Sequence, residues 1–434
     1  MTPHPGTTPP RTRHGLRPQD AGPLGRRASA AALGCAVVYV LALLGPGGTA
    51  AADTPSPSPT DLPTVRQTLP DVQENGCRKA STKSVDGLPW AQVYLHPEAV
   101  WPLGRGKGVT VAVLASGVDS AAGGAAGPLA GRLRLGPRVY GQGDSGRDCV
   151  GHGTLLAGLV AARAASDGGP AGVAPEATVL AVAVTDDAGT TTPDLLAQGI
   201  RAAADNGARI ALVGVPAAGS SQQLADAVGY ATAKGVLLVA PTAPDDAQAK
   251  GAVYPAALPG VLAVAGVGPD GAAINAAPAR VDLAAPGTQL RAPGPGGGQF
   301  TTDGASGAAA LTAGTAALLL SREPALTPDR LAARLKATAY RPGTAVPDPL
   351  LGWGTVDPVA ALSAPTAAAP TAAALPAPQV VVPPAPDPTP VRRATALAWS
   401  AAALAVVVAL GAAAARVHRR RTGDTARHPA RHPA

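Results

Sequence analysis

The sequence has few side chains that could hold a metal ion or a cofactor. It contains three cysteines and seven histidines in 434 residues. Five of the histidines lie in the terminal regions of the chain: His4, His14, His418, His428 and His432. No group of ligands has the spacing of a metal site, and no Asp-rich loop indicates bound calcium. We therefore expect neither a metal nor a cofactor.

The chain also lacks a basic domain. Its formal net charge is +7, but residues 1–52 hold five arginines and one aspartate, and residues 392–434 hold eight arginines and one aspartate. The long stretch between these ends is acidic overall. A domain that binds DNA or RNA carries clustered basic residues on its folded surface. We therefore expect no nucleic-acid partner.

Aromatic residues make up only 3% of the chain, whereas 46% of it is hydrophobic and it contains 53 glycines and 47 prolines. The hydrophobic fraction is too high for a wholly disordered chain, although the glycine and proline leave room for tethers. The length suffices for two or three domains, or for one large domain with appendages.

Residues 1–52 have the pattern of a secretory signal peptide. Arg26 and Arg27 precede a hydrophobic run over 28–44, and small residues follow at 49–52. This order predicts export and cleavage near the end of that stretch. The alternative is an uncleaved N-terminal anchor, although the run is shorter than the ~20 residues of a membrane span.

Residues 394–415 contain no charged side chain and would extend about 33 Å as a helix, enough to cross a bilayer. Arginines are more frequent after this segment than before it. The positive-inside rule then places the tail, 416–434, in the cytoplasm and everything upstream outside the cell membrane. The alternative is a buried alanine-rich helix.

Residues 363–393 form a predicted Pro/Ala-rich linker, with nine prolines between Pro365 and Pro390. Such a segment is extended and polyproline-like, so it would hold a domain away from the membrane. The remaining chain divides into an N-terminal extension, 53–88, and a body, 89–362.

One disulfide is predicted. Because Cys35 lies in the signal segment, an exported chain keeps only Cys77 and Cys149, and an oxidising compartment favours their pairing. The bond would tie the extension to the loop before His152 and stabilise the fold by roughly 4 kcal/mol on the loop-entropy view. The alternative is two free thiols.

The body alternates strands and helices. Short hydrophobic runs predict strands buried on both faces, at 109–114, 178–184, 210–215, 236–240 and 261–267. Helices are predicted between them, one capped by Thr192 and ending at Gly207, another over 224–234. This order indicates an α/β fold, a mostly parallel sheet with helices on both faces. Functional groups then lie beyond the carboxyl ends of the strands.

Three motifs follow one another at the ends of these elements: Ala115-Ser116-Gly117-Val118-Asp119 after the first strand, then Gly151-His152-Gly153-Thr154 and Gly304-Ala305-Ser306, each opening a helix. Their order and context resemble the subtilisin-like serine proteases, whose triad runs Asp, His, Ser. Segments 254–261, 281–288 and 352–358 extend the resemblance over nearly all of the body. It implies a subtilisin-like fold and a serine protease site.

The order of segments around the body resembles the mycosins, the membrane-anchored subtilases of actinobacterial type VII secretion systems. The shared features are a signal peptide, a disulfide-tied extension, a Pro-rich tether, a single C-terminal span and a basic tail. The resemblance implies a cell membrane location and other secretion components of the membrane as partners.

The resemblance places Ser306 as nucleophile and His152 as base, but two other positions depart from the family. Ala115 stands at the position of the triad carboxylate, and Pro244, which has no N–H, at that of the oxyanion Asn. In subtilisin, loss of the carboxylate lowers kcat by about 3 × 10⁴ and loss of the Asn by about 10² to 10³. We therefore predict a pseudoprotease in which no acidic residue orients the imidazole.

Alternatives remain open. Asp119, Asp144 or Asp148 could replace the missing carboxylate, and His152 and Ser306 could persist only as caps of their helices. Three functions follow: a structural or assembly subunit of a type VII secretion system, a serine endopeptidase that cleaves secreted proteins with a His152–Ser306 dyad, or an extracytoplasmic module that binds peptides in the old substrate cleft.

Overall fold

The computed structural model describes residues 62–164, 169–246, 251–274, 280–365 and 410–416. It divides into two units, Met1–Pro365 and Thr366–Ala434. In the second unit residues 410–416 are helical, and no helix in the described part of the chain is both long and apolar enough to cross a membrane. The predicted signal peptide, most of the linker and most of 394–415 lie outside the described residues.

The first unit is built on a twisted sheet. Its strands are β1 (Thr110–Ala115), β2 (Leu133–Arg138), β3 (Thr178–Ala183), β4 (Ile210–Val213), β5 (Leu237–Pro241), β6 (Val261–Val267), β7 (Ala273–Ile274) and β8 (Leu283–Pro286). They lie in the order β2-β3-β1-β4-β5-β6-β7, and β8 pairs with β6. All pairs are parallel except β6 with β7. The predicted mostly parallel sheet is confirmed, and each of the five predicted strands is present.

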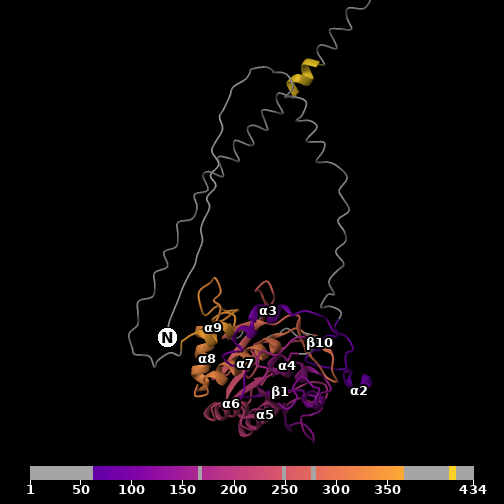
Figure 1. The fold of residues 1–434 in the computed structure, drawn as a ribbon, viewed down its shortest axis with the longest axis vertical. Coiled ribbons are helices and arrows are strands. Elements are labelled where there is room, and N and C mark those ends of the chain that lie inside the picture. Colours follow the sequence, from indigo (N-terminus) through magenta and orange to yellow (C-terminus); the bar gives the residue numbers. More distant parts are fainter. Residues whose placement is uncertain (1–61, 165–168, 247–250, 275–279, 366–409, 417–434) are drawn as a thin grey trace, which may run out of the picture. The chain divides into compact units, whose positions relative to one another are not determined.

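Helices cover both faces of this sheet. They include α4 (His152–Ala161), α5 (Pro193–Asp205), α6 (Gln222–Ala233), α7 (Ala305–Arg322), α8 (Pro328–Ala337) and α9 (Pro358–Ser363). Alternate residues of β1 face different helices, because side chains along a strand point to opposite faces. Val111 and Val113 belong to the buried cluster that includes residues of α4 and α7, whereas Ala112 and Leu114 belong to the cluster that includes residues of α5 and α6. Figure 1 shows β1 between α4 and α5.

Local sequence accounts for the helix starts on the α5–α6 face. Thr192 caps α5 by accepting from the Leu195 N–H at 3.2 Å, and Pro193 occupies the first turn as predicted. Ser221 caps α6 in the same way, accepting from the Leu224 N–H. The helix predicted over 224–234 therefore begins two residues earlier, at Gln222, because the serine side chain satisfies its first turn.

The N-terminal extension packs against the body. It contains α2 (Val72–Asn75) and leads into α3 (Trp90–Leu95) and a 3₁₀ turn, η3 (Pro97–Val100). The predicted Cys77–Cys149 disulfide is present. Next to it the Arg78 Nε donates to the Val150 carbonyl at 2.8 Å, and burial lowers the pKa of this guanidinium.

A short hairpin completes the unit. It consists of β9 (Leu290–Pro293) and β10 (Gln299–Thr302), which are antiparallel. Arg291 reaches from β9 to the Val85 carbonyl at 2.8 Å, and burial lowers its pKa. Because α7 begins three residues after β10, the hairpin leads directly to Ser306.

Candidate active site

His152 and Ser306 come from the first turns of two buried helices. His152 opens α4, and Ser306 is the second residue of α7. Both side chains are fully buried. The His152 Nε2 lies 3.0 Å from the Ser306 Oγ, within hydrogen-bond reach. The structure thus brings together the two residues that the motifs single out as base and nucleophile.

The other nitrogen of the imidazole has no partner. His152 Nδ1 is buried and makes no hydrogen bond to any of the described residues. Ala115, at the carboxyl end of β1, is fully buried and offers only a methyl group. A general base of this kind is held by a carboxylate that accepts from the Nδ1 N–H. That orienting group is missing from the described site.

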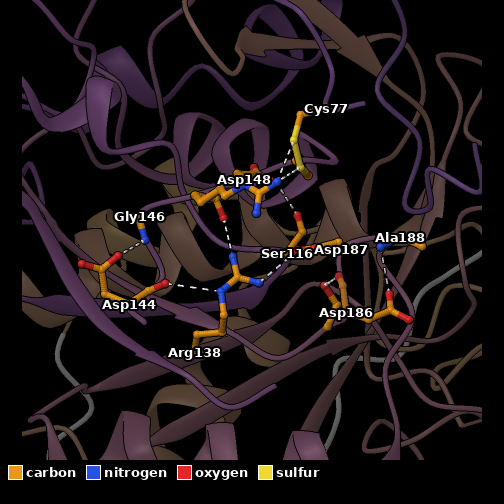
Figure 2. Close-up of polar contacts among 12 residues, drawn as sticks. Cys77, Ser116, Arg138, Asp144, Gly146, Asp148, Asp186, Asp187 and Ala188 are labelled. Carbon is orange, nitrogen blue, oxygen red and sulfur yellow. Dashed lines mark hydrogen bonds and ion pairs between the residues drawn. A yellow bond between two sulfur atoms is a disulfide. The ribbon is translucent and has the colours of Figure 1, made fainter. Parts of the chain in front are cut away.

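Two of the acidic residues considered as substitutes for the triad carboxylate, Asp119 and Asp144, accept hydrogen bonds from backbone amides. Asp119 accepts from the Ala121 N–H at 3.0 Å and from the Gly296 N–H at 2.6 Å. Asp144 accepts from the Gly146 N–H at 2.9 Å, as Figure 2 shows. The contacts with Ala121 and Gly146 are local turn contacts, whereas Gly296 lies 177 residues from Asp119 in the sequence. The structure places neither carboxylate on the His152 ring.

Asp148, the third candidate, holds the start of α4. Its carboxylate accepts from the Gly151 N–H at 2.8 Å, the Thr154 N–H at 2.8 Å, the Thr154 hydroxyl at 2.6 Å and the Ser116 hydroxyl at 2.7 Å. Ser116 in turn accepts from the Gly153 N–H at 3.1 Å; Asp148 and Ser116 are drawn in Figure 2. The carboxylate caps a helix whose first amides have no intrahelical partner.

A carboxylate does reach the imidazole, but from Asp245 and at Nε2. Its Oδ2 lies 3.2 Å from His152 Nε2 and accepts from the Ser306 hydroxyl, and its Oδ1 accepts from the Ser306 N–H at 3.0 Å. The Asp245 side chain is 2% exposed. Among acidic residues, the sequence-based prediction weighs only Asp119, Asp144 and Asp148 as partners of the imidazole. It misses Asp245, whose signal is the acidic pair directly after Pro244.

The comparisons with known proteins agree with this arrangement of motifs. The profile of the Subtilase family matches residues 106–354. Mycosin-4 of Mycobacterium tuberculosis is 32% identical over 89% of this chain and 96% of its own. Mycosin-1 of the same organism is also 32% identical, over 89% of this chain and 99% of its own. The chain belongs to the subtilase family, in its mycosin branch.

A solved structure supports the same assignment. It is described as a serine protease, MycP1, an essential component of the type VII (ESX-1) secretion system. It has a TM-score of 0.59 and 29% identity, and the match covers 70% of this chain and 98% of that one. The subtilisin-like fold predicted from the motifs is therefore confirmed.

The Ser306 N–H of this subtilase already has a carboxylate as its acceptor. In serine proteases the N–H of the nucleophile helps to bind the oxyanion that forms in the transition state. Here that N–H is already bound to a carboxylate, which can only accept hydrogen bonds. While this hydrogen bond is present, the N–H cannot donate to an oxyanion. Pro244, at the position of the family's Asn, cannot donate a backbone hydrogen bond either.

No metal site accompanies these residues. Among the residues that the structure describes, no three or more His, Cys, Asp or Glu side chains lie close enough together to hold a metal ion.

Proposed function

We propose that this mycosin homologue is a membrane-anchored subunit of a type VII secretion system that acts by occupying a place in the assembly and not by proteolysis. The observation that carries the proposal is the Asp245 carboxylate, which contacts the hydroxyl and the N–H of Ser306 and the Nε2 of His152. All three groups would have to be free for peptide hydrolysis.

The lack of a carboxylate at His152 Nδ1 is a second reason to expect little proteolysis, beside the Asp245 carboxylate on Ser306. In subtilisin, removal of the orienting carboxylate alone lowers kcat by about 3 × 10⁴. A single missing oxyanion donor costs about 10² to 10³. Such losses are not additive, but either is large enough to leave little turnover. An assembly role needs the folded domain and its anchor, and neither depends on the triad.

The sequence pattern and the relatives are what support the proposed place in the cell. Mycosin-4 and Mycosin-1 match over nearly their whole length, and one solved relative is described as a component of a type VII secretion system. We infer that residues 394–415 anchor the chain in the cell membrane, that residues 1–52 direct its export, and that its partners are other membrane components of the system.

A genetic experiment tests this role. Deletion of the gene is expected to impair export of the small helical substrates of the secretion system, and Ser306→Ala should restore export fully. Ser220→Ala, an exposed serine on the same domain, is the matched control for expression. Normal export in the deletion strain would contradict the proposal, and so would failure of Ser306→Ala where Ser220→Ala succeeds.

The second candidate is an active serine endopeptidase, favoured by the 3.0 Å contact between His152 Nε2 and Ser306 Oγ. It requires that the purified wild-type chain hydrolyse casein and react with a fluorophosphonate, and that Ser306→Ala abolish both. We expect the wild type to be indistinguishable from Ser306→Ala in both assays. Turnover that disappears with the serine would establish the protease instead.

A further inference from the structure

The N-terminal extension reaches the active site. Residues 62–69, here called the strap, run beside β10, the strand that leads to Ser306. The Val65 N–H donates to the Thr301 carbonyl at 2.7 Å, and the Thr301 N–H donates to the Pro63 carbonyl at 3.0 Å. The Thr302 hydroxyl donates to the Val65 carbonyl at 2.9 Å. This pairing gives the first half of the strap a fixed position next to the nucleophile's helix.

The second half of the strap holds the loop that carries Asp245. The Gln67 side-chain carbonyl accepts from the Asp245 N–H at 3.0 Å, and Gln67 is only 6% exposed. The Thr68 N–H and hydroxyl both donate to the Asp246 Oδ2, at 2.7 and 2.5 Å. The loop is thus fixed at two successive residues by two successive residues of the strap.

The far end of the strap is fixed as well. The Leu69 N–H donates to the Ala188 carbonyl at 2.8 Å, in the loop that follows β3. A Cβ added at Gly189 would lie 2.5 Å from the Gln67 carbonyl oxygen, so the two backbones are in close contact there. The strap therefore crosses from β10, past the loop after β5, to the loop after β3.

The chain also provides a seat for the Asp245 carboxylate. Gly304, the residue before α7, has a φ of 143°, and a Cβ there would lie 1.9 Å from Asp245 Oδ1. Only glycine leaves this space open. The seat, the strap and the hydrogen bonds to Ser306 are separate observations that place the same carboxylate.

We propose that the strap and Asp245 form a built-in latch. Gln67 and Thr68 hold the loop so that the Asp245 carboxylate stays on the N–H and hydroxyl of Ser306, and release of these two residues uncovers the serine. Gln67 and Thr68 are positioning residues, since they act through Asp245. The latch depends on the proposed non-proteolytic role in one respect: that role explains why the serine is kept covered.

Amide exchange at Ser306 tests the latch without requiring any catalysis. Because this amide lies in the first turn of α7, it has no intrahelical acceptor and depends on Asp245 for protection. Deuterium exchange of the full chain in detergent, resolved to single amides, is compared in wild type, Asp245→Ala and the double variant Gln67→Ala with Thr68→Val. Asp245→Ala is expected to exchange the Ser306 amide about tenfold faster or more, because it removes the charged acceptor of that amide. The strap variant is expected to accelerate exchange by less, because the backbone N–H groups of Gln67 and Thr68 still bind Asp246.

The matched control is Gln222→Ala with Thr232→Val on α6, which should leave the Ser306 amide unchanged. Exchange in β1 reports whether each variant is folded, and Thr68→Val alone serves if the double variant is not. An unchanged Ser306 amide in Asp245→Ala would overturn the latch. Faster exchange in Asp245→Ala but not in the strap variant would remove the strap from it. Loss of the secretion role would leave these exchange rates unaffected, so the two proposals fail separately.

Discussion

The starts of α4 and α7 face each other. In each, a carboxylate binds at least one backbone amide that has no intrahelical acceptor, but the two carboxylates differ. Each helix begins after a glycine and places one residue of the His152–Ser306 pair in its first turn. The amides of α4 are bound by Asp148, three to six residues away along the chain. The Ser306 amide of α7 is bound by Asp245, which is 61 residues away.

The difference lies in what each carboxylate covers. Asp148 binds two backbone amides and two hydroxyls, so it stabilises the start of a helix, and none of these contacts involves the His152 ring or Ser306. Asp245 satisfies an amide just as well, but it does so in the space that an oxyanion would occupy. The first arrangement leaves the hydroxyl and the N–H of Ser306 free, and the second does not. The proposal that this chain does not act as a protease rests on the second.

The largest expected effect is a gain of peptidase activity. It requires removing the Asp245 carboxylate from Ser306 and supplying a carboxylate for His152 Nδ1. Ala115→Asp would place an acid at the end of β1, whose residue 115 packs against the first turn of α4: a Cβ at Gly153 would lie 3.1 Å from the Ala115 Cβ. Combined with Asp245→Ala, it should orient His152 and free Ser306. We expect kcat/KM for a chromogenic peptide to rise by about 10³ to 10⁴ over wild type, slightly below the loss seen in subtilisin.

One single and one double variant sharpen this experiment. Ala115→Asp alone should gain far less, because Asp245 still occupies the N–H of Ser306. Ala115→Asn with Asp245→Ala has nearly the same volume without the charge and should gain little as well. A folded Ala115→Asp, Asp245→Ala variant that is as inactive as wild type would show that the obstacle lies elsewhere in the site.

The free energy of unfolding should depend more on Asp148 than on Asp245. Asp148→Ala leaves the buried Gly151 and Thr154 amides without acceptors, so we expect a loss of about 3 to 5 kcal/mol in the free energy of unfolding. Asp245→Ala removes fewer contacts and also removes a buried charge, so its loss should stay near 1 kcal/mol. Urea unfolding of both variants checks the difference, with Asp148→Asn expected to recover part of the loss. Equal losses would mean that Asp245 is as structural as Asp148.

The strands, the start of α5 and the disulfide of this fold could be predicted from the sequence. The buried strands appear as hydrophobic runs, Thr192 and Pro193 mark the start of α5, and the Cys77–Cys149 pairing follows from having only two cysteines beyond the signal segment. These features depend on a few neighbouring residues. The departures at Ala115 and Pro244 come from the resemblance to the family's motifs and stay predictions.

The contact of the Asp245 carboxylate with Ser306 could not be predicted in this way. Gln67 meets the Asp245 N–H across 178 residues of sequence, and Thr64 meets Thr301 across 237. The Asp245 side chain turns toward Ser306 because of these contacts and because Gly304 leaves it room. Nothing in the segment after β5 specifies that direction, so an acidic pair after Pro244 looked like an ordinary polar loop.

The smallest expected effect tests how tightly the seat at Gly304 and the Asp245 carboxylate depend on each other. Gly304→Ala should destabilise the wild type, both because φ is 143° and because the new Cβ would meet Asp245 Oδ1. The backbone cost is the same in an Asp245→Ala background, whereas the clash disappears there. A double-mutant cycle of unfolding free energies should therefore give a coupling of about 1 kcal/mol or more. Additive losses would show that the carboxylate does not lie against Gly304, and the contrast between the two helix starts would then lose its physical basis.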